Sequence, residues 1–320
     1  MAKMIRAACF MAMMAGASAS QAQSNVTISG FLDVGVYRDY DKAGKVGPIQ
    51  PSNITFRGSE DLGSGLATTF ALSHRLDTST GAIESANKPF WSGEATVGLK
   101  GSFGSVQIGR RLDAIYSNDY DFDPWYYFNR VASPAWDLWH YNFPSDPKGN
   151  AGTAEYGRLN NGVFYDSPKF AGGFSVHLSA SPEKSPADNN KPIAATVKYS
   201  NKQFAAMYAY GKNSAGNTDN FFALKGHFGN FALMGAYDVS KASLSKAKSL
   251  TLGGTYTMGN TVLRAGWGQV DVDGVKAQKA MGIGVLYSLS KRTSVYADVG
   301  RKVYPSRSAN AFGAGLTYTF

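Results

Sequence analysis

The sequence predicts an all-β protein, a sixteen-stranded antiparallel transmembrane β-barrel with a long third loop folded into the pore. Three observations support this prediction. The chain has an N-terminal export segment, no later stretch is apolar enough for a transmembrane helix, and an apolar–polar alternation of period two recurs along almost the whole chain. Such strands fit a wall between lipid and water. In the last segment, one face carries Phe312, Ala314, Leu316, Tyr318 and Phe320.

The N-terminus has the features of a signal peptide. Lys3 and Arg6 supply a basic region, and residues 7–16 form an apolar run that is too short to span a bilayer as a helix. The small residues Ser20 and Ala22 favour cleavage of the chain between Ala22 and Gln23. We therefore assign residues 1–22 to a signal peptide. Residues 23–320 form a single β-barrel domain, because no linker or change of composition divides them.

Charge and cysteine content narrow the function. The chain carries a net charge of +9, of which Lys3 and Arg6 supply two, so the mature chain carries +7. A basic balance favours nucleic acid, an anionic surface or anionic solutes as partners, and export argues against nucleic acid. The single cysteine, Cys9, lies in the signal peptide. The mature barrel must therefore close by hydrogen bonding and packing rather than by disulfides.

Short turns and longer loops alternate along the chain. The turns are rich in residues that accept turn dihedrals. Seven turns and eight loops imply sixteen strands with both termini on the short-turn side, the usual plan of an outer-membrane barrel. A large soluble β-sandwich or solenoid is the alternative, but its loops would not alternate so regularly. The expected loops are residues 39–50, 78–89, 113–154, 182–191, 212–218, 240–248, 271–278 and 304–308.

The alternation also sorts the charged residues. They fall opposite the apolar face, where they avoid the cost of about 2–4 kcal/mol that Lys or Arg incurs on the lipid face at mid-membrane. This predicts a wet, charged lumen. The expected lumen cations are Arg57, Arg75, Lys100, Arg158, Lys198, Lys225, Arg264 and Lys302, and the expected anions are Asp33, Glu94, Asp166, Asp238 and Asp298.

The pair Arg110–Arg111 has two interpretations. Strict alternation turns Arg111 into the lumen and Arg110 outward. Gly109 can allow a local break in the strand that reverses this. We expect at least one of the two arginines to reach the pore.

The segment 113–154 is too long for a plain connection. Its aromatic and acidic composition requires packing against something, and the lumen is the available cavity. Opposite a wall of arginines, this loop would narrow the pore and set a transverse field. An outer cap or a subunit contact is the other interpretation. The segment contains Trp125, Trp136 and Trp139, together with Asp113, Asp119, Asp121, Asp123 and Asp137.

Six motifs lie at intervals along the mature chain: Asn25–Val36, Ser52–Gly63, Val97–Gly104, Gly109-Arg110, Arg158–Pro168 and the terminal Phe320. Together they resemble the general porins of Gram-negative outer membranes, most closely the branch typical of β-proteobacteria. The resemblance covers essentially the whole mature chain. The chain departs from the family at Asn53, where members often carry an arginine, and in the third loop, which lacks the usual short Phe-Gly-Gly tip.

The resemblance implies a trimeric barrel with arginines facing acidic groups of the third loop across a constriction. Arg57, Arg110 and Arg158 match the basic positions, and Phe320 resembles the family's assembly signal. We expect the acidic side to comprise Asp119, Asp121 and Asp123. The implied partners are two further copies of the chain, outer-membrane lipid and lipopolysaccharide, the barrel-assembly machinery and small anionic solutes.

We therefore predict an outer-membrane channel for passive diffusion of small hydrophilic solutes, with a preference for anions. A channel specific for aromatic or other organic carboxylates, stacked on Trp125, Trp136 and Trp139, is the alternative. No nucleophile motif accompanies the four histidines and no spacing indicates a zinc site, so no enzyme activity, cofactor, metal or nucleic-acid partner is expected. A receptor or adhesin would have several long outer loops, whereas here only the third is long.

Overall fold

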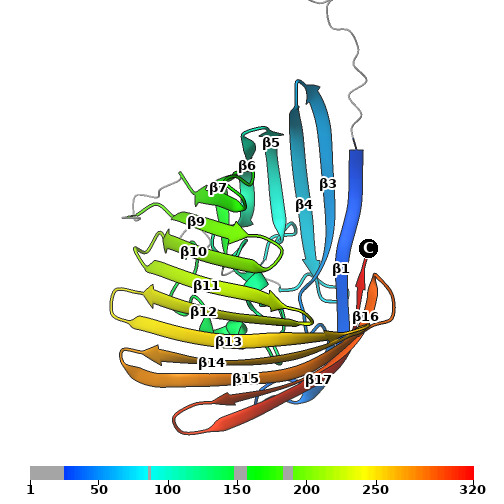
Figure 1. Ribbon diagram of the computed structural model, residues 1–320, viewed down its shortest axis with the longest axis vertical. Helices are drawn as coiled ribbons and strands as arrows, with labels where there is room; N and C mark the ends of the chain where they lie inside the picture. The colour runs from blue at the N-terminus through cyan, green and yellow to red at the C-terminus, as the bar shows by residue number, and fades with distance from the viewer. Residues whose placement is uncertain (1–24, 86–87, 148–156, 183–189) are drawn as a thin grey trace, which may run out of the picture.

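The computed structural model describes residues 25–85, 88–147, 157–182 and 190–320. The expected signal peptide, residues 1–22, lies outside the described residues. The chain forms one continuous antiparallel sheet (Figure 1). Its elements are β1 (Asn25–Arg38), β2 (Gly44–Gly47), β3 (Ser52–Gly63), β4 (Leu66–Leu76), β5 (Glu94–Gly101), β6 (Gly104–Leu112), η1 (Tyr120–Phe122), α2 (Ala135–Leu138), β7 (Arg158–Asp166), β8 (Phe174–Ala180), β9 (Ile193–Ser200), β10 (Phe204–Lys212), β11 (Thr218–Phe228), β12 (Phe231–Lys241), β13 (Lys246–Met258), β14 (Thr261–Val272), β15 (Val275–Ser288), β16 (Thr293–Val303) and β17 (Ser308–Thr319).

The sheet closes on itself because β1 has a neighbour on each side. Its first half pairs with β3 and its second half with β17, and Phe31 faces both Asn53 and Thr319. The short strand β2 pairs with the end of β1 and adds nothing to the circumference. The remaining sixteen strands of the described chain form the wall. The sixteen-stranded antiparallel barrel predicted from the sequence is therefore confirmed.

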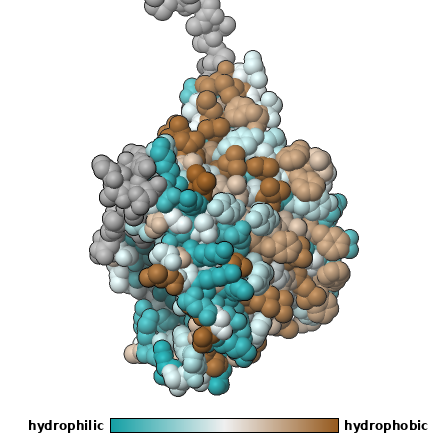
Figure 2. All heavy atoms as spheres, turned by 90° about the vertical axis from the view of Figure 1, so that its left-hand side faces the viewer, coloured by the Kyte–Doolittle hydropathy of each residue, from teal (hydrophilic) through white to brown (hydrophobic). Residues whose placement is uncertain are grey.

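The period-two pattern of the sequence appears as alternating burial along the strands. In β17, Phe312 and Leu316 are 53% and 41% exposed, whereas Ala311, the residue before Phe312, is fully buried. Residues alternate in this way because successive side chains of a strand point to opposite faces of the sheet. Figure 2 shows apolar residues gathered at the top and right of the view, with polar residues over the centre and lower left. A continuous apolar outer surface is what a barrel in lipid requires.

The tight turns have the geometry that their composition predicts. The β11–β12 hairpin closes with Phe228 paired to Phe231, and Gly229 between them has a φ of 60°. Glycine adopts this left-handed conformation without the steric cost that a Cβ would add. The hairpin between β13 and β14 repeats the arrangement at Gly259, whose φ is 56°.

The core lies between the wall and the segment that joins β6 to β7. This β6–β7 segment is described over residues 113–147 and contains η1 and α2. Its apolar side chains form three clusters with wall residues, including Trp139 with Phe221 and Val131 with Ala311. Within the described ranges, no helix has the length and apolar character needed to cross a bilayer.

Candidate functional site

A cavity of about 760 Å³ lies between the β6–β7 segment and the wall. Its lining combines cations, anions and aromatic rings, so it is suited to charged or aromatic solutes. The cations are Lys42, Arg75, Lys88, Arg130, Arg158 and Lys302, the anions are Asp39, Glu84 and Asp137, and the aromatic residues include Tyr127, Phe128, Trp136 and Trp139.

Arg158, one of the three arginines assigned from the sequence, lines this cavity. It lies at the first position of β7, and its Nε donates a hydrogen bond of 2.7 Å to the backbone oxygen of Gly93. Arg75 and Arg110 are close enough to Arg158 to repel its charge. Three guanidinium groups are therefore gathered at this side of the barrel.

Glu84 partly balances these cations. It lies 2.5 Å from Arg75 and 2.8 Å from Lys88. Burial alone would raise the pKa of Glu84, but the two cations outweigh burial and lower it. The carboxyl therefore stays ionised at neutral pH and holds Arg75 and Lys88 at the cavity lining.

The strand break considered at Gly109 is present. The register between β6 and β7 shifts between Gly109 and Arg111, and Gly109 has a φ of 134°. Arg110 is buried, and its guanidinium donates to Asn160 Oδ1 at 2.6 Å and to the oxygen of Ser92 at 3.2 Å. Arg111 pairs with Asp166 at 2.6 Å. Both arginines are thus held by polar partners.

Arg57 is the third of the arginines assigned from the sequence. It lines a separate cavity with Thr27 and Lys100, and its side chain is 56% exposed. Its guanidinium is 3.4 Å from Glu94, one of the anions that the alternation assigned to the lumen. More than half of the Arg57 side chain is therefore accessible to solvent.

The three expected loop acids have different environments. Asp121 is 37% exposed and contacts the ammonium of Lys198 at 2.6 Å. Asp119 is fully buried against His140. Asp123 is buried, accepts backbone hydrogen bonds from residues 125 and 127, and lines a third cavity of about 490 Å³. Of the three, Asp121 is the one exposed to solvent.

Burial changes the ionisation of two acids in the β6–β7 segment. Burial raises the pKa of Asp123 to about 6, and the hydrogen bond from Ser133 at 3.0 Å only partly opposes this. Burial likewise raises the pKa of Asp113 to about 6 against a hydrogen bond from Ser145. The ionised forms of both carboxyls are therefore disfavoured inside the segment.

The loop tryptophans are mostly committed to packing. Trp125 is buried, and its indole Nε1 donates to Asp298 at 2.8 Å. Trp139 is also buried and donates to Thr251 Oγ1 at 2.9 Å. Trp136 is only partly buried, and the centre of its ring lies 5.8 Å from the guanidinium carbon of Arg130. Trp136 therefore presents more of its surface to the cavity than the other two.

Two features of the cavity were not assigned from the sequence. Arg130 lies in the segment itself, where strand alternation gives no guide, and it reaches the rings of Trp136 and Tyr37. Lys302 was assigned to the lumen, but its ion pair with Asp137 of α2 was not assigned. Its ammonium also lies 3.9 Å from the centre of the Tyr40 ring.

The terminal Phe320 is fixed at the point where the barrel closes. Its backbone exchanges two hydrogen bonds with Gly30, at 3.0 and 3.1 Å. A Cβ on Gly30 would lie 2.6 Å from the Phe320 ring, so the absence of a side chain at Gly30 makes room for the ring.

Comparison with known proteins identifies relatives over most of the chain. A model of the Gram-negative porin family matches residues 7–307. The major outer membrane protein P.IB of Neisseria gonorrhoeae is 27% identical over 199 residues, which cover 59% of this chain and 52% of that protein. The chain thus spans about half the length of that relative. Outer membrane porin protein 32 of Delftia acidovorans is 27% identical over 90% of this chain and 87% of its own.

Solved structures share the fold. An anion-selective porin from Comamonas acidovorans superimposes with a TM-score of 0.78 at 20% identity, covering 93% of this chain and all of that one. The trimer form of OmpT from Vibrio cholerae has a TM-score of 0.67 at 16% identity and covers 93% of this chain and 99% of that one.

Proposed function

We propose that this chain, which belongs to the family of Gram-negative porins, forms a water-filled channel through which small hydrophilic solutes diffuse passively. Relatives in Neisseria and Delftia are outer-membrane proteins, and this chain belongs to the outer membrane of a Gram-negative bacterium. The matched relatives are porins, channel proteins rather than enzymes. The observation that carries the proposal is a closed barrel that encloses a cavity rich in basic side chains.

The β6–β7 segment folds into the pore and narrows it. Three sets of contacts support this part of the proposal. Trp125 reaches Asp298 of β16, Trp139 reaches Thr251 of β13, and Lys198 of β9 reaches Asp121. Strands from separate parts of the wall therefore hold one segment, as expected if it crosses the lumen.

An anion preference follows from the charges beside this segment. Arg158, Arg110 and Arg57 supply the basic side of the constriction, and Asp121 supplies the exposed part of the acidic side. Cations on a narrow, partly desolvated wall raise the local anion concentration and lower the barrier to anion passage. A structural neighbour described as anion-selective is consistent with this preference.

A reversal potential under a KCl gradient tests the preference. Purified protein is inserted into a planar bilayer with low salt on both sides, and the sign of the zero-current voltage distinguishes chloride from potassium permeation. We expect chloride to dominate. Cation selectivity would mean that the loop carboxylates control the field, and the arginine constriction would be abandoned.

A channel specific for organic carboxylates is the second candidate. The favouring observation is that Trp136 lies beside Arg130 in the cavity that Arg158 also lines. An aromatic carboxylate could stack on the ring while its charge is held by a guanidinium. Benzoate should then block chloride current transiently, and acetate should not. Equal behaviour of the two anions would leave the general channel as the better account.

We also propose a homotrimer in lipid and lipopolysaccharide that is inserted by the barrel-assembly machinery. One structural neighbour is described in a trimer form. The protein should migrate in detergent as an oligomer that dissociates on boiling. A monomer by light scattering in mild detergent would contradict the trimer without affecting the channel proposal.

A further inference from the structure

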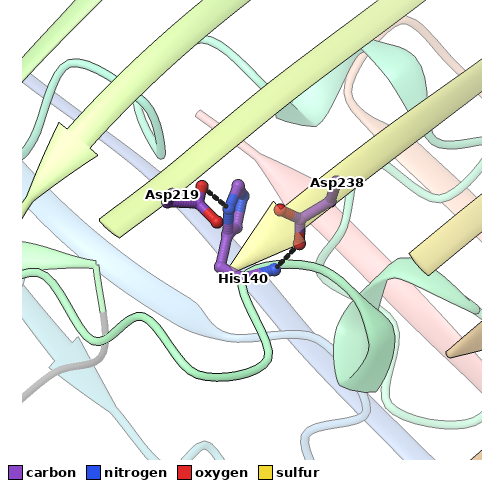
Figure 3. A group of neighbouring side chains, drawn as sticks. All are labelled: His140, Asp219 and Asp238. Carbon is purple, nitrogen blue, oxygen red and sulfur yellow. Dashed lines mark hydrogen bonds and ion pairs between the residues drawn. The ribbon is translucent and has the colours of Figure 1, made fainter. Parts of the chain in front are cut away.

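Three acidic side chains and one histidine meet where the β6–β7 segment contacts strands β11 and β12 of the wall. His140 follows α2 in this segment, Asp219 lies in β11 and Asp238 lies in β12 (Figure 3). The side chains of His140 and Asp219 are completely buried, and Asp238 is 1% exposed. The figure shows the two carboxylates on either side of the histidine. The fold thus brings His140 together with Asp219 and Asp238, which lie 79 and 98 positions further along the chain.

The geometry of the cluster matches a three-ligand metal site. One ligand atom from each of His140, Asp219 and Asp238 can be chosen so that all lie within 4.8 Å of one another. The imidazole Nδ1 of His140 is 2.8 Å from Asp219 Oδ2. The backbone N–H of His140 donates to Asp238 Oδ2 at 2.5 Å. Each carboxylate therefore uses one oxygen to position the histidine.

The second oxygens of the two carboxylates, Asp219 Oδ1 and Asp238 Oδ1, accept no hydrogen bond from an N–H or hydroxyl group among the described residues, and both atoms are inaccessible to solvent. The two carboxyl groups lie close enough for a hydrogen bond between them, which requires a shared proton. A buried carboxylate oxygen without a partner is costly because the desolvation of its charge is not compensated. Two such oxygens beside a histidine can be satisfied in two ways, by a proton shared between the carboxyl groups or by a cation.

The other nitrogen of His140 has the partner that a metal-bound histidine requires. Its Nε2 lies 3.0 Å from Asp119 Oδ2, and Asp119 is fully buried. Histidines that bind metals usually donate the second ring N–H to a carboxylate, which fixes the tautomer and orients the ring. Nε2 keeps its proton, and Nδ1 can coordinate beside Asp219 and Asp238 once it loses the proton that it shares with Asp219 Oδ2.

We propose that His140, Asp219 and Asp238 bind a divalent transition-metal cation of the Zn²⁺ class. Imidazole nitrogen and carboxylate oxygen are both ligands of such ions. The three side chains would have to close around the ion to reach metal–ligand distances of about 2.0–2.2 Å. Binding replaces the proton between Nδ1 and Asp219, and this proton leaves to solvent, so the charge gained at the site is one positive unit per ion.

The bound cation would fasten the β6–β7 segment to the wall. His140 belongs to the segment, whereas the two aspartates belong to adjacent strands that pair directly, with Asp238 opposite Phe221. A metal ion coordinated by both sides of this junction resists movement of the segment more strongly than hydrogen bonds do. Any consequence for pore conductance rests on the proposed channel function, but metal binding itself does not.

Refolding of the full mature chain tests the site, because a buried cluster is accessible to metal while the chain folds. The chain is refolded in detergent with and without Zn²⁺, freed of excess metal, and its zinc content and melting temperature are measured. We expect one retained zinc per chain and a higher melting temperature with zinc. Retention of less than one tenth of a zinc ion per chain would overturn the proposal. It would mean that a shared proton satisfies the carboxylates.

Matched variants locate the metal. Asp219→Asn and Asp238→Asn should each abolish retention, and Asp119→Asn should weaken zinc affinity about 10–100-fold because it removes the group that orients the ring. His177→Gln is the control, since His177 pairs with Asp166 at 2.7 Å in a comparable histidine–carboxylate contact away from the cluster. Equal zinc retention by wild type and by Asp238→Asn would refute the assignment. Asp119→Asn keeps all three ligands and serves as the second variant if Asp238→Asn does not fold.

Discussion

The indole N–H of Trp125 donates a 2.8 Å hydrogen bond to Asp298, a residue 173 positions further along the chain. The second oxygen of Asp298 accepts an equally short hydrogen bond from Asn129. One wall carboxylate in β16 therefore binds two residues of the β6–β7 segment. Both hydrogen bonds are buried, so their loss leaves a polar group without a partner.

Replacing Trp125 by Phe should loosen this attachment. The substitution keeps an aromatic ring but leaves Asp298 Oδ1 unsatisfied, which costs about 1–3 kcal/mol for a buried acceptor. We expect a lower melting temperature in detergent and noisier single-channel current. Trp136→Phe is the control, because Trp136 is only partly buried and lies against Arg130. Identical stability and noise in the two variants would show that the hydrogen bond does not restrain the segment.

The exposed Arg57 should contribute to anion selectivity. Its side chain is 56% exposed, and a unit charge acts on a nearby ion through water with about 1 kcal/mol at 4 Å. Arg57→Gln should therefore reduce the chloride-to-potassium permeability ratio by roughly twofold to fivefold at 0.1 M salt. The difference should vanish near 1 M, where the screening length is about 3 Å.

The control for this measurement is Lys291→Gln in the turn between β15 and β16, which removes one positive charge outside the strands. Permeability ratios are obtained from reversal potentials for both variants. A reduction of the same size in Lys291→Gln would assign the effect to net charge rather than to the position of Arg57.

The wall could be predicted from the sequence because its signal is local. Alternation along a strand such as β17 follows from the geometry of the strand. The glycine at position 229 indicates a turn because glycine readily adopts the left-handed conformation that the turn requires. Strand count and closure follow from repetition of these signals. The short strand β2 was missed, since its four residues, Gly44–Gly47, lie in a stretch without clear alternation.

The interior could be predicted only in part. The glycine at position 109 indicated that the strand could break there, whereas strict alternation did not, and neither could identify the partners of Arg110. Inside the β6–β7 segment no period exists, so the burial of Asp119 and the exposure of Asp121 could not be distinguished. The contacts of His140 depend on residues about 80 to 100 positions away.

Deletion of Phe320 should impair insertion of the barrel. The deletion removes two backbone hydrogen bonds to Gly30 at the seam where β1 meets β17, together with the ring that covers Gly30. Outer-membrane levels in cells should fall, and heat-modifiable protein should decrease. Gly30→Val is a second variant that displaces the ring without shortening the chain. Normal levels of both variants would show that the terminal residue has no role in assembly.

The stability of the β6–β7 segment should depend on pH through Asp123. Burial raises the pKa of Asp123 to about 6 from its ordinary value of 3.8. The folded state therefore binds the proton more tightly than the unfolded state. This stabilisation is complete below about pH 4 and is lost as the pH rises through 6, and its size is on the order of 3 kcal/mol.

Asp123→Asn should remove this dependence, because the amide is neutral at every pH and its oxygen can still accept the backbone N–H groups of Trp125 and Tyr127. Guanidinium unfolding in detergent should show that the variant gains stability relative to wild type as the pH rises from 4.5 to 8. Ser133→Ala should act in the opposite direction. It removes a hydrogen bond of 3.0 Å to the carboxylate, raises the pKa of Asp123 further, and steepens the loss of stability with pH. A difference between Asp123→Asn and wild type that stays constant across this range would mean that Asp123 is not the titrating group.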